Sequence, residues 1–279
     1  MTLEFYSDRQ LAVLEALETY RFLTVKQMVR LGISKSETSL RDKILRPLKT
    51  RRSAPIKAYD LGRYQQLPHI FVLTAQGAKD LAEYRQVPVS EIKWPKGGAQ
   101  FSRTFHHRIA QIDFHIAFRQ WAREVGAEIE FVHMDFDKAG SQRQGGAIPL
   151  TRLPLSDGNY IISDGIFCFS LHGQRLLYCL EIHNETDTTR VVNQLLQYSD
   201  ALQSQSIAKK FELKTQPIIL SVLMRQPSEP QTTARKALER GIPTNFAPCF
   251  VFMDGFNGEI SDGCNWRDPN GKSVIPFPV

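Results

Sequence analysis

The chain has 279 residues, 42% of them hydrophobic, which is enough for a sizeable core in one large domain or two smaller ones. It contains no run of about 18 apolar residues and no charged-then-apolar leader, so we expect neither a membrane span nor a secretory signal. The four cysteines form no CxxC pair and no zinc-type spacing, which favours a reducing bacterial cytoplasm.

The positive charge is concentrated near the beginning of the chain. Residues 1–85 contain 15 Lys and Arg against nine Asp and Glu, whereas residues 86–279 contain 20 of each, so the whole excess of +6 lies in the first third. Between Lys26 and Arg63, 11 basic residues face only three acidic ones. A localised basic region of this kind indicates a polyanionic partner, and we expect double-stranded DNA.

Three patterns of Ser or Thr followed three residues later by Gln or Glu predict helix starts at Ser7, Thr24 and Ser34. The apolar spacing that follows them predicts a first helix, a short second helix and a third helix over 35–48, with a turn at Gly32 before the third. Two helices joined by a glycine turn, the second rich in Ser, Thr, Lys and Arg, are typical of a helix-turn-helix.

A basic hairpin follows, with strands expected over 56–61 and 69–73 around a polar turn over 62–68. Basic residues in such a hairpin would lie along DNA phosphates, while outward residues of the third helix would contact bases and phosphates. The candidate DNA-contacting residues are Lys35, Thr38, Ser39, Arg41, Lys43, Arg46, Arg51, Arg52 and Lys57.

A helix that begins after Thr74 and ends near Tyr84, with the sequence TAQGAKDLAEY, closes this region. The order of three helices, basic hairpin and closing helix resembles bacterial winged-helix DNA-binding domains, and the resemblance covers residues 1–85. The alternative interpretation is a small helical interaction domain, whose basic residues only form a solvated surface. Residues 86–101, which carry two prolines and a Gly-Gly pair, are predicted to be a linker to a second domain over 102–279.

The second domain is predicted to be mixed α/β, with helices and strands around one central sheet. Its first helix, over 103–125, carries His106, His107 and His115, which in helices more often pack than bind metal. The polar, glycine-containing segment over 135–159 is expected to be an irregular surface excursion that could close over a substrate. The other expected elements are a strand over 127–134, a helix over 188–203, a strand over 217–224, a helix over 232–240 and a final strand over 248–253.

Residues 160–183 predict a β-hairpin, because two apolar strands flank His172-Gly173, which can take the positive φ angles of a tight turn. A loop of two or four residues places Asp164 opposite Glu181, whereas a three-residue loop would break this register. Two carboxylates about 5 Å apart repel by roughly 3 kcal/mol at an effective dielectric near 20, which Mg²⁺ or Mn²⁺ would offset. His183 shares the strand face of Glu181, and Glu185 follows just beyond. The alternative is a solvated strand face with two acids.

The order of helix, strand, Asp-bearing strand, Glu-bearing strand, helix and strand is similar to the restriction-endonuclease-like core. That resemblance implies that Asp164 and Glu181 bind the metal ion and that residue 183 stabilises attack on a phosphodiester. The family usually has lysine where this chain has His183, so His183 would orient or deprotonate water, or Arg190 would supply the positive charge.

With the winged helix in front, the chain resembles plasmid replication-relaxation proteins and related mobilisation relaxases, including the segment HHRIAQID with His107 and Asp113. The resemblance implies metal-dependent nicking of origin DNA, with other DNA-processing proteins or a second copy of the chain as further partners. The alternative is a non-cutting accessory or regulatory factor, which the His183 departure favours. A regulator with a small-molecule sensor would leave the paired acids unexplained. The absence of HxH and GxSxG motifs argues against tyrosine relaxases and serine hydrolases.

Overall fold

The computed structural model describes residues 6–61, 68–96, 105–139, 146–184, 188–224, 236, 239–240, 244–256, 258–260 and 266–277. The chain divides into two compact units, Met1–His106 and His107–Val279. The fold class is mixed α/β, as predicted, because both units combine helices with a sheet and the larger sheet has parallel and antiparallel pairs.

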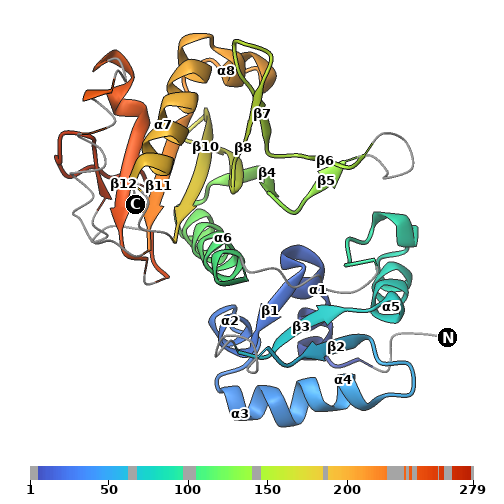
Figure 1. Ribbon diagram of the computed structural model, residues 1–279. Helices are drawn as coiled ribbons and strands as arrows, with labels where there is room; N and C mark the ends of the chain where they lie inside the picture. The colour runs from blue at the N-terminus through green and yellow to red at the C-terminus, as the bar shows by residue number, and fades with distance from the viewer. Residues whose placement is uncertain are drawn as a thin grey trace. The chain divides into compact units, whose positions relative to one another are not determined.

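The first unit is built from short helices around a three-stranded antiparallel sheet with the order β1-β3-β2 (Figure 1). The helix predicted as the third runs without a break over residues 37–50, with a π-helical segment, Leu40–Leu45, in its middle. The elements are α1 (Asp8–Tyr20), β1 (Phe22–Thr24), α2 (Val25–Arg30), α3 (Glu37–Ser39), α4 (Arg46–Thr50), β2 (Ile56–Tyr59), β3 (Ile70–Leu73) and α5 (Ala75–Arg85).

Two of the three predicted capping boxes are confirmed, at Ser7 before α1 and at Thr24 before α2. The third is wrong by two residues. The Ser34 hydroxyl bonds to the backbone of Ser36 within the preceding turn, and the Ser36 side chain accepts the hydrogen bond from the Ser39 amide that caps the helix. The helix therefore begins at Glu37, and Lys35 lies in the turn before it.

Helix α5 packs tightly against the chain segment that leads into β2. A Cβ atom at Gly77 would lie 2.2 Å from the carbonyl oxygen of Pro55, so only glycine fits there. The Thr74 hydroxyl caps α5 and also donates to the Ala54 carbonyl at 2.7 Å. These contacts fix the base of the β2–β3 hairpin, whose residues 62–67 lie outside the described part of the chain.

The segment predicted as a linker over 86–101 is described as far as Lys96, and this part belongs to the first unit. It contains a short 3₁₀ helix, Val89–Glu91, that contacts α5. Ile92 is buried, and the Lys93 amide donates to the Glu18 carboxylate at 3.4 Å.

The second unit has a six-stranded sheet with the order β13-β12-β11-β10-β9-β4. Strands β10, β11 and β12 are parallel to one another. The other pairs are antiparallel: β4 with β9, β9 with β10, and β12 with β13. The elements are α6 (Phe105–Val125), β4 (Glu128–Met134), β5 (Lys138–Ala139), β6 (Ile148–Pro149), β7 (Arg152–Pro154), β8 (Tyr160–Ile162), β9 (Gly165–Leu171), β10 (Gln174–His183), α7 (Thr188–Gln203), α8 (Ser206–Lys210), β11 (Ile218–Leu223), a 3₁₀ helix (Thr244–Cys249), β12 (Phe250–Asp254) and β13 (Trp266–Arg267).

Helices cover both faces of this sheet (Figure 1). One core lies between the sheet and α6, where Phe114, Phe118 and Trp121 pack against strand residues such as Phe167 and Leu180. The other core lies under α7 and α8, whose Leu195, Tyr198 and Ile207 pack against the opposite side chains of the same strands. Successive side chains of β9 and β10 therefore point alternately into these two apolar cores.

The hairpin prediction is confirmed in its turn and register. Leu171 pairs with Gln174 and Gly165 with Leu180, and His172 and Gly173 both have positive φ, 50° and 76°, so the loop has two residues. Its first strand is shorter than predicted, because residues 160–162 form β8, which pairs with β7 in a separate small sheet. The Ser163 amide donates to the Thr151 carbonyl, so this residue still pairs with the small sheet, and the chain enters the large sheet after it.

Three other expectations need correction or stay untested. The excursion over 135–159 is not irregular throughout, because it contains β5, β6 and β7 and buries Leu153 completely. The strand at 250–254 is not the last, since β13 follows it. The helix predicted over 232–240 lies almost entirely outside the described residues. Among the described residues, no helix combines the length and apolar character that a membrane span requires.

Candidate active site and candidate DNA interface

Three acidic residues stand at the same level of the large sheet, on three neighbouring strands. The ladder of β4 with β9 ends at Met134 and Gly165, and the ladder of β9 with β10 ends at Gly165 and Leu180. Asp135, Asp164 and Glu181 are the next residues along these strands. The Asp135 amide donates to the Asp164 carbonyl at 3.1 Å, and the Asp164 amide donates to the Leu180 carbonyl at 3.0 Å. We call these three residues the acidic row.

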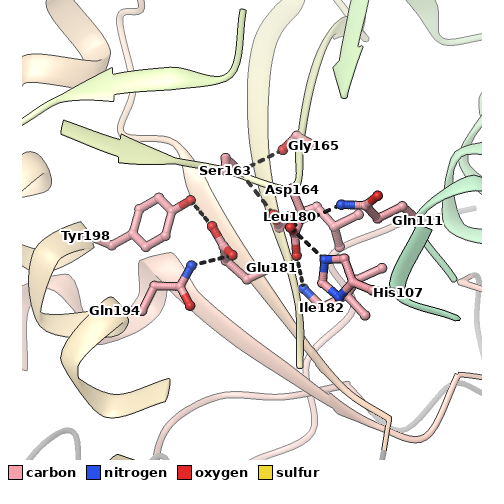
Figure 2. Close-up of polar contacts among 10 residues, drawn as sticks. All are labelled: His107, Gln111, Ser163, Asp164, Gly165, Leu180, Glu181, Ile182, Gln194 and Tyr198. Carbon is pink, nitrogen blue, oxygen red and sulfur yellow. Dashed lines mark hydrogen bonds and ion pairs between the residues drawn. The ribbon is translucent and has the colours of Figure 1, made fainter. Parts of the chain in front are cut away.

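Asp164 occupies the centre of the acidic row, and its carboxylate caps the end of the ladder. Its Oδ2 atom accepts a hydrogen bond from the Ile182 amide at 2.7 Å, in place of the backbone carbonyl that a longer β9 would offer. Its Oδ1 atom lies 2.8 Å from His107 Nε2 and accepts from Gln111 Nε2 at 3.0 Å, and both of these side chains come from α6 (Figure 2).

Glu181 points the other way, toward α7. The hydroxyl of Tyr198 donates to Oε1, and Gln194 Nε2 donates to Oε2 at 2.5 Å (Figure 2). The side chain is only 2% exposed, so burial raises the pKa of Glu181 well above its ordinary value, and the negative charge of Asp164 raises it further. The predicted repulsion between the two acids is thus present, although their hydrogen-bond partners lie on opposite faces of the sheet.

The two histidines near Asp164 respond to it in different ways. Burial lowers the pKa of His107, but the hydrogen bond and the charge of Asp164 outweigh that effect, so the net shift is upward. Burial dominates at His183 and lowers its pKa to about 4, so this imidazole is neutral at neutral pH. The His183 Nε2 atom is buried and finds no hydrogen-bond partner in the part of the chain that the structure describes.

Asp135 is the acid that the sequence-based prediction missed. Its Oδ1 atom is buried and likewise lacks a hydrogen-bond partner among the described residues. Burial raises the pKa of Asp135, repulsion from Asp164 adds to the shift, and the nearby positive charges of Arg108 and His107 oppose it. Asp135 and Asp164 therefore share one electrostatic environment, which also includes the His107 imidazole.

No family model, curated protein or solved structure matches this chain. Among the described residues, no three His, Cys, Asp or Glu side chains already form a group that could hold a metal ion. The predicted metal ligands Asp164 and Glu181 are nonetheless adjacent across β9 and β10, and His183 lies two residues beyond Glu181 on the same strand. Glu185 lies outside the described residues, and Arg190 is exposed in the first turn of α7.

The predicted DNA-contacting residues all lie on or beside two elements of the first unit, the helix over 37–50 and strand β2. Ser39 and Arg51 are half-buried, and the Arg51 guanidinium stacks 4.4 Å from the centre of the Tyr6 ring. Arg41 pairs with Glu37 at 2.9 Å one helical turn away. The exposed members of the predicted set are Lys35, Thr38, Arg41, Lys43, Arg46, Arg52 and Lys57.

Proposed function

We propose that this chain is a DNA-binding protein of plasmid or mobile-element replication or mobilisation, and that it nicks origin DNA with the help of a divalent metal ion. DNA binding is assigned to the first unit. The observation that carries it is the run of exposed basic side chains along the helix over 37–50 and strand β2. A helix of this kind enters the major groove in helix-turn-helix proteins, and basic residues beside it contact phosphates.

The order of elements in the first unit supports a winged-helix interpretation. Helix α2 and the helix over 37–50 are joined by a turn at Gly32, whose φ is +78°, and the β2–β3 hairpin follows. The three strands pair antiparallel, as a wing and the short strand β1 would. In this proposal the helix over 37–50 reads the DNA, and Arg52 and Lys57 contact phosphates at the edge of the hairpin.

Titration of DNA binding against salt tests this proposal. Each phosphate contact releases condensed counterions, so log K falls with log salt by about 0.9 per contact. Arg51→Ala/Arg52→Ala is expected to weaken binding to duplex DNA and to flatten the slope by up to about 2. The control is Lys79→Ala/Lys214→Ala, which removes two exposed lysines that belong to neither of these elements. Equal slopes for the two double variants would contradict the proposed interface.

The second unit is proposed to cut the phosphodiester, with Asp164 and Glu181 as ligands of Mg²⁺ or Mn²⁺. Hard divalent ions are held by one or two carboxylates together with water and substrate phosphates. The repulsion between Asp164 and the buried Glu181 suits a bound cation, and the partnerless Nε2 atom of His183 suits a positioned water. The ion would polarise the scissile phosphate and lower the pKa of its water. A neutral His183 is suited to orienting that water or accepting its proton.

Conversion of supercoiled plasmid to open circle tests the cutting activity. The plasmid carries the transfer or replication origin adjacent to the gene, and the assay compares Mg²⁺, Mn²⁺ and EDTA. The unaltered chain is expected to nick only with metal, and Glu181→Ala is expected to lose nicking. Glu128→Ala, on an exposed residue of β4, is expected to nick normally. Nicking by Glu181→Ala at the normal rate would remove Glu181 from the site.

A second candidate function, a DNA-binding accessory or regulatory factor that does not cut, has one observation in its favour. Both oxygens of Glu181 and both oxygens of Asp164 already accept hydrogen bonds from protein donors, and the residue at the lysine position is a neutral histidine. Under this function the second unit serves for docking or dimerisation. DNA binding without nicking by the unaltered chain, together with a dimer in sedimentation, would favour it over the first.

A further inference from the structure

We propose that Asp135 is a further metal ligand of the candidate active site, which binds the divalent ion together with Asp164 and Glu181. This inference rests on the proposed function of the second unit and names a residue that the resemblance to nucleases does not supply. It depends on the placement of Asp135 in the acidic row, on its unbonded carboxylate oxygen and on the partnerless imidazole of His183.

The placement follows from the sheet. Asp135 follows the last paired residue of β4, and Asp164 precedes the first paired residue of β9. The backbone hydrogen bond from the Asp135 amide to the Asp164 carbonyl continues the pairing by one residue. Residues in such neighbouring positions have Cβ atoms roughly 4.5 to 5.5 Å apart, a separation that one cation can bridge.

The available ligand atom distinguishes Asp135 from the other two acids. Glu181 has both oxygens held by α7, and Asp164 has both held by α6 and the Ile182 amide. Asp135 Oδ1 is a buried oxygen of the acidic row that finds no hydrogen-bond partner among the described residues. A buried carboxylate oxygen without a donor is costly, and a cation removes that cost.

His183 supplies an independent sign of a ligand. Its side chain is 9% exposed, its Nε2 is partnerless in the described structure, and the imidazole interacts electrostatically with Asp164 and His107. A water bound to the ion would give this nitrogen a partner. Waters and phosphate oxygens supply the rest of the coordination that Mg²⁺ usually has, so a preformed group of three protein ligands is not required.

Binding of Mn²⁺ alone to the full chain, followed by the electron paramagnetic resonance signal of the free ion, tests the inference without relying on cleavage. Asp135→Asn and Asp164→Asn are each expected to weaken Mn²⁺ binding at least tenfold. Glu128→Gln is the matched control, because it makes the same acid-to-amide change on an exposed residue of β4, and its affinity is expected to be unchanged. Thermal melting in EDTA checks that each variant is folded.

A second measurement on the unaltered chain does not depend on any variant folding. Substoichiometric Mn²⁺ is expected to broaden the backbone amide signals of Phe136 and Gly165, which flank the two proposed ligands, more than those of Glu128 and Ser170 at the other end of the same strands. Uniform broadening would overturn the inference. Mn²⁺ affinity lost in Asp164→Asn and Glu181→Gln but kept in Asp135→Asn would overturn it while leaving the proposed nuclease site intact. Absence of Mn²⁺ binding by the unaltered chain would overturn both.

Discussion

Replacement of Glu181 by glutamine provides a direct test of the buried network, because it removes the charge while keeping the shape of the side chain. The Tyr198 hydroxyl can donate to the new amide oxygen or accept from its NH₂ group, and the Gln194 amide can turn to present its oxygen. The hydrogen bonds are therefore replaceable, and the main change is the loss of the carboxylate of a buried residue. We expect Glu181→Gln to gain stability over the unaltered chain as the pH rises.

The magnitude follows from proton linkage. Burial and Asp164 hold the folded pKa of Glu181 well above the unfolded value near 4.5, so between these two pKa values the folded chain binds a proton that the unfolded chain has released. The stabilising contribution of this group is complete below the unfolded pKa and is lost as the pH rises through the folded pKa. Within that window, each pH unit reduces the stability of the unaltered chain by about 1.4 kcal/mol, and glutamine removes this loss.

Urea unfolding of the second unit at pH 5, 6, 7 and 8, in EDTA, measures the difference between the two chains. Glu130→Gln is the control with the opposite sign, because the hydrogen bond and charge of Arg175 lower the pKa of Glu130. Its contribution is lost only as the pH falls through the lowered pKa, so its difference from the unaltered chain should be constant from pH 5 to 8. A pH-independent difference for Glu181→Gln would refute the raised pKa of the buried carboxyl group.

Three further predictions test the hydrogen bond of Tyr198, the packing of α5 in the first unit and the two histidines near Asp164. Tyr198→Phe removes a hydrogen bond that lowers the pKa of Glu181, so the stability of the chain should decline with rising pH over a wider range. The lost hydrogen bond should also reduce the free energy of unfolding by about 1–3 kcal/mol. Urea unfolding at pH 5 and pH 8 measures both effects, and values equal to those of the unaltered chain would contradict the prediction. Gly77→Ala should destabilise the first unit by about 1–3 kcal/mol in urea unfolding, because the new Cβ would overlap the Pro55 carbonyl, and a variant as stable as the unaltered chain would contradict the packing of α5. In an NMR titration of the imidazole groups from pH 8 to 5, His183 should stay neutral, because burial lowers its pKa to about 4. His107 should titrate above 6.5, because the hydrogen bond and charge of Asp164 raise its pKa. A midpoint near 6.5 for His183 would show that its ring is exposed to water.

The parts of the fold that depend on local sequence were predictable. The His172-Gly173 turn fixed the register of β9 with β10, because a two-residue loop leaves only one set of pairs. Helix α7 begins and ends at the predicted residues, Thr188 and Gln203, since its apolar stripe has a clear helical period. The third capping box failed because the side chains of Ser34 and Ser36 can both bond to nearby backbone groups, and only the geometry of the turn decides which one caps the helix.

The parts of the site that depend on distant residues were not predictable. Asp135 joins the acidic row only through the pairing of β4 with β9, and an irregularity between Ile129 and Phe131 shifts that register. No short loop connects these two strands, so the sequence gives no rule for aligning them. Tyr198 lies on the apolar face of α7, and an apolar face in the sequence marks a core residue without showing that its hydroxyl reaches Glu181.

The histidine at position 183 changes how the charge of the candidate site is balanced. A lysine there would remain a cation beside the acids, whereas burial keeps His183 neutral. Positive charge near the acidic row then comes from the protonated form of His107 and from Arg108, both on α6, and from Arg190 on α7. These groups stand on the two helices that flank the sheet, so the positive charge comes from its sides rather than from strand β10. A divalent ion between Asp135 and Asp164 would place positive charge within the acidic row itself. Measurement of Mn²⁺ binding therefore tests directly whether the site balances its acids with a metal ion, which the replacement of lysine by histidine at position 183 does not.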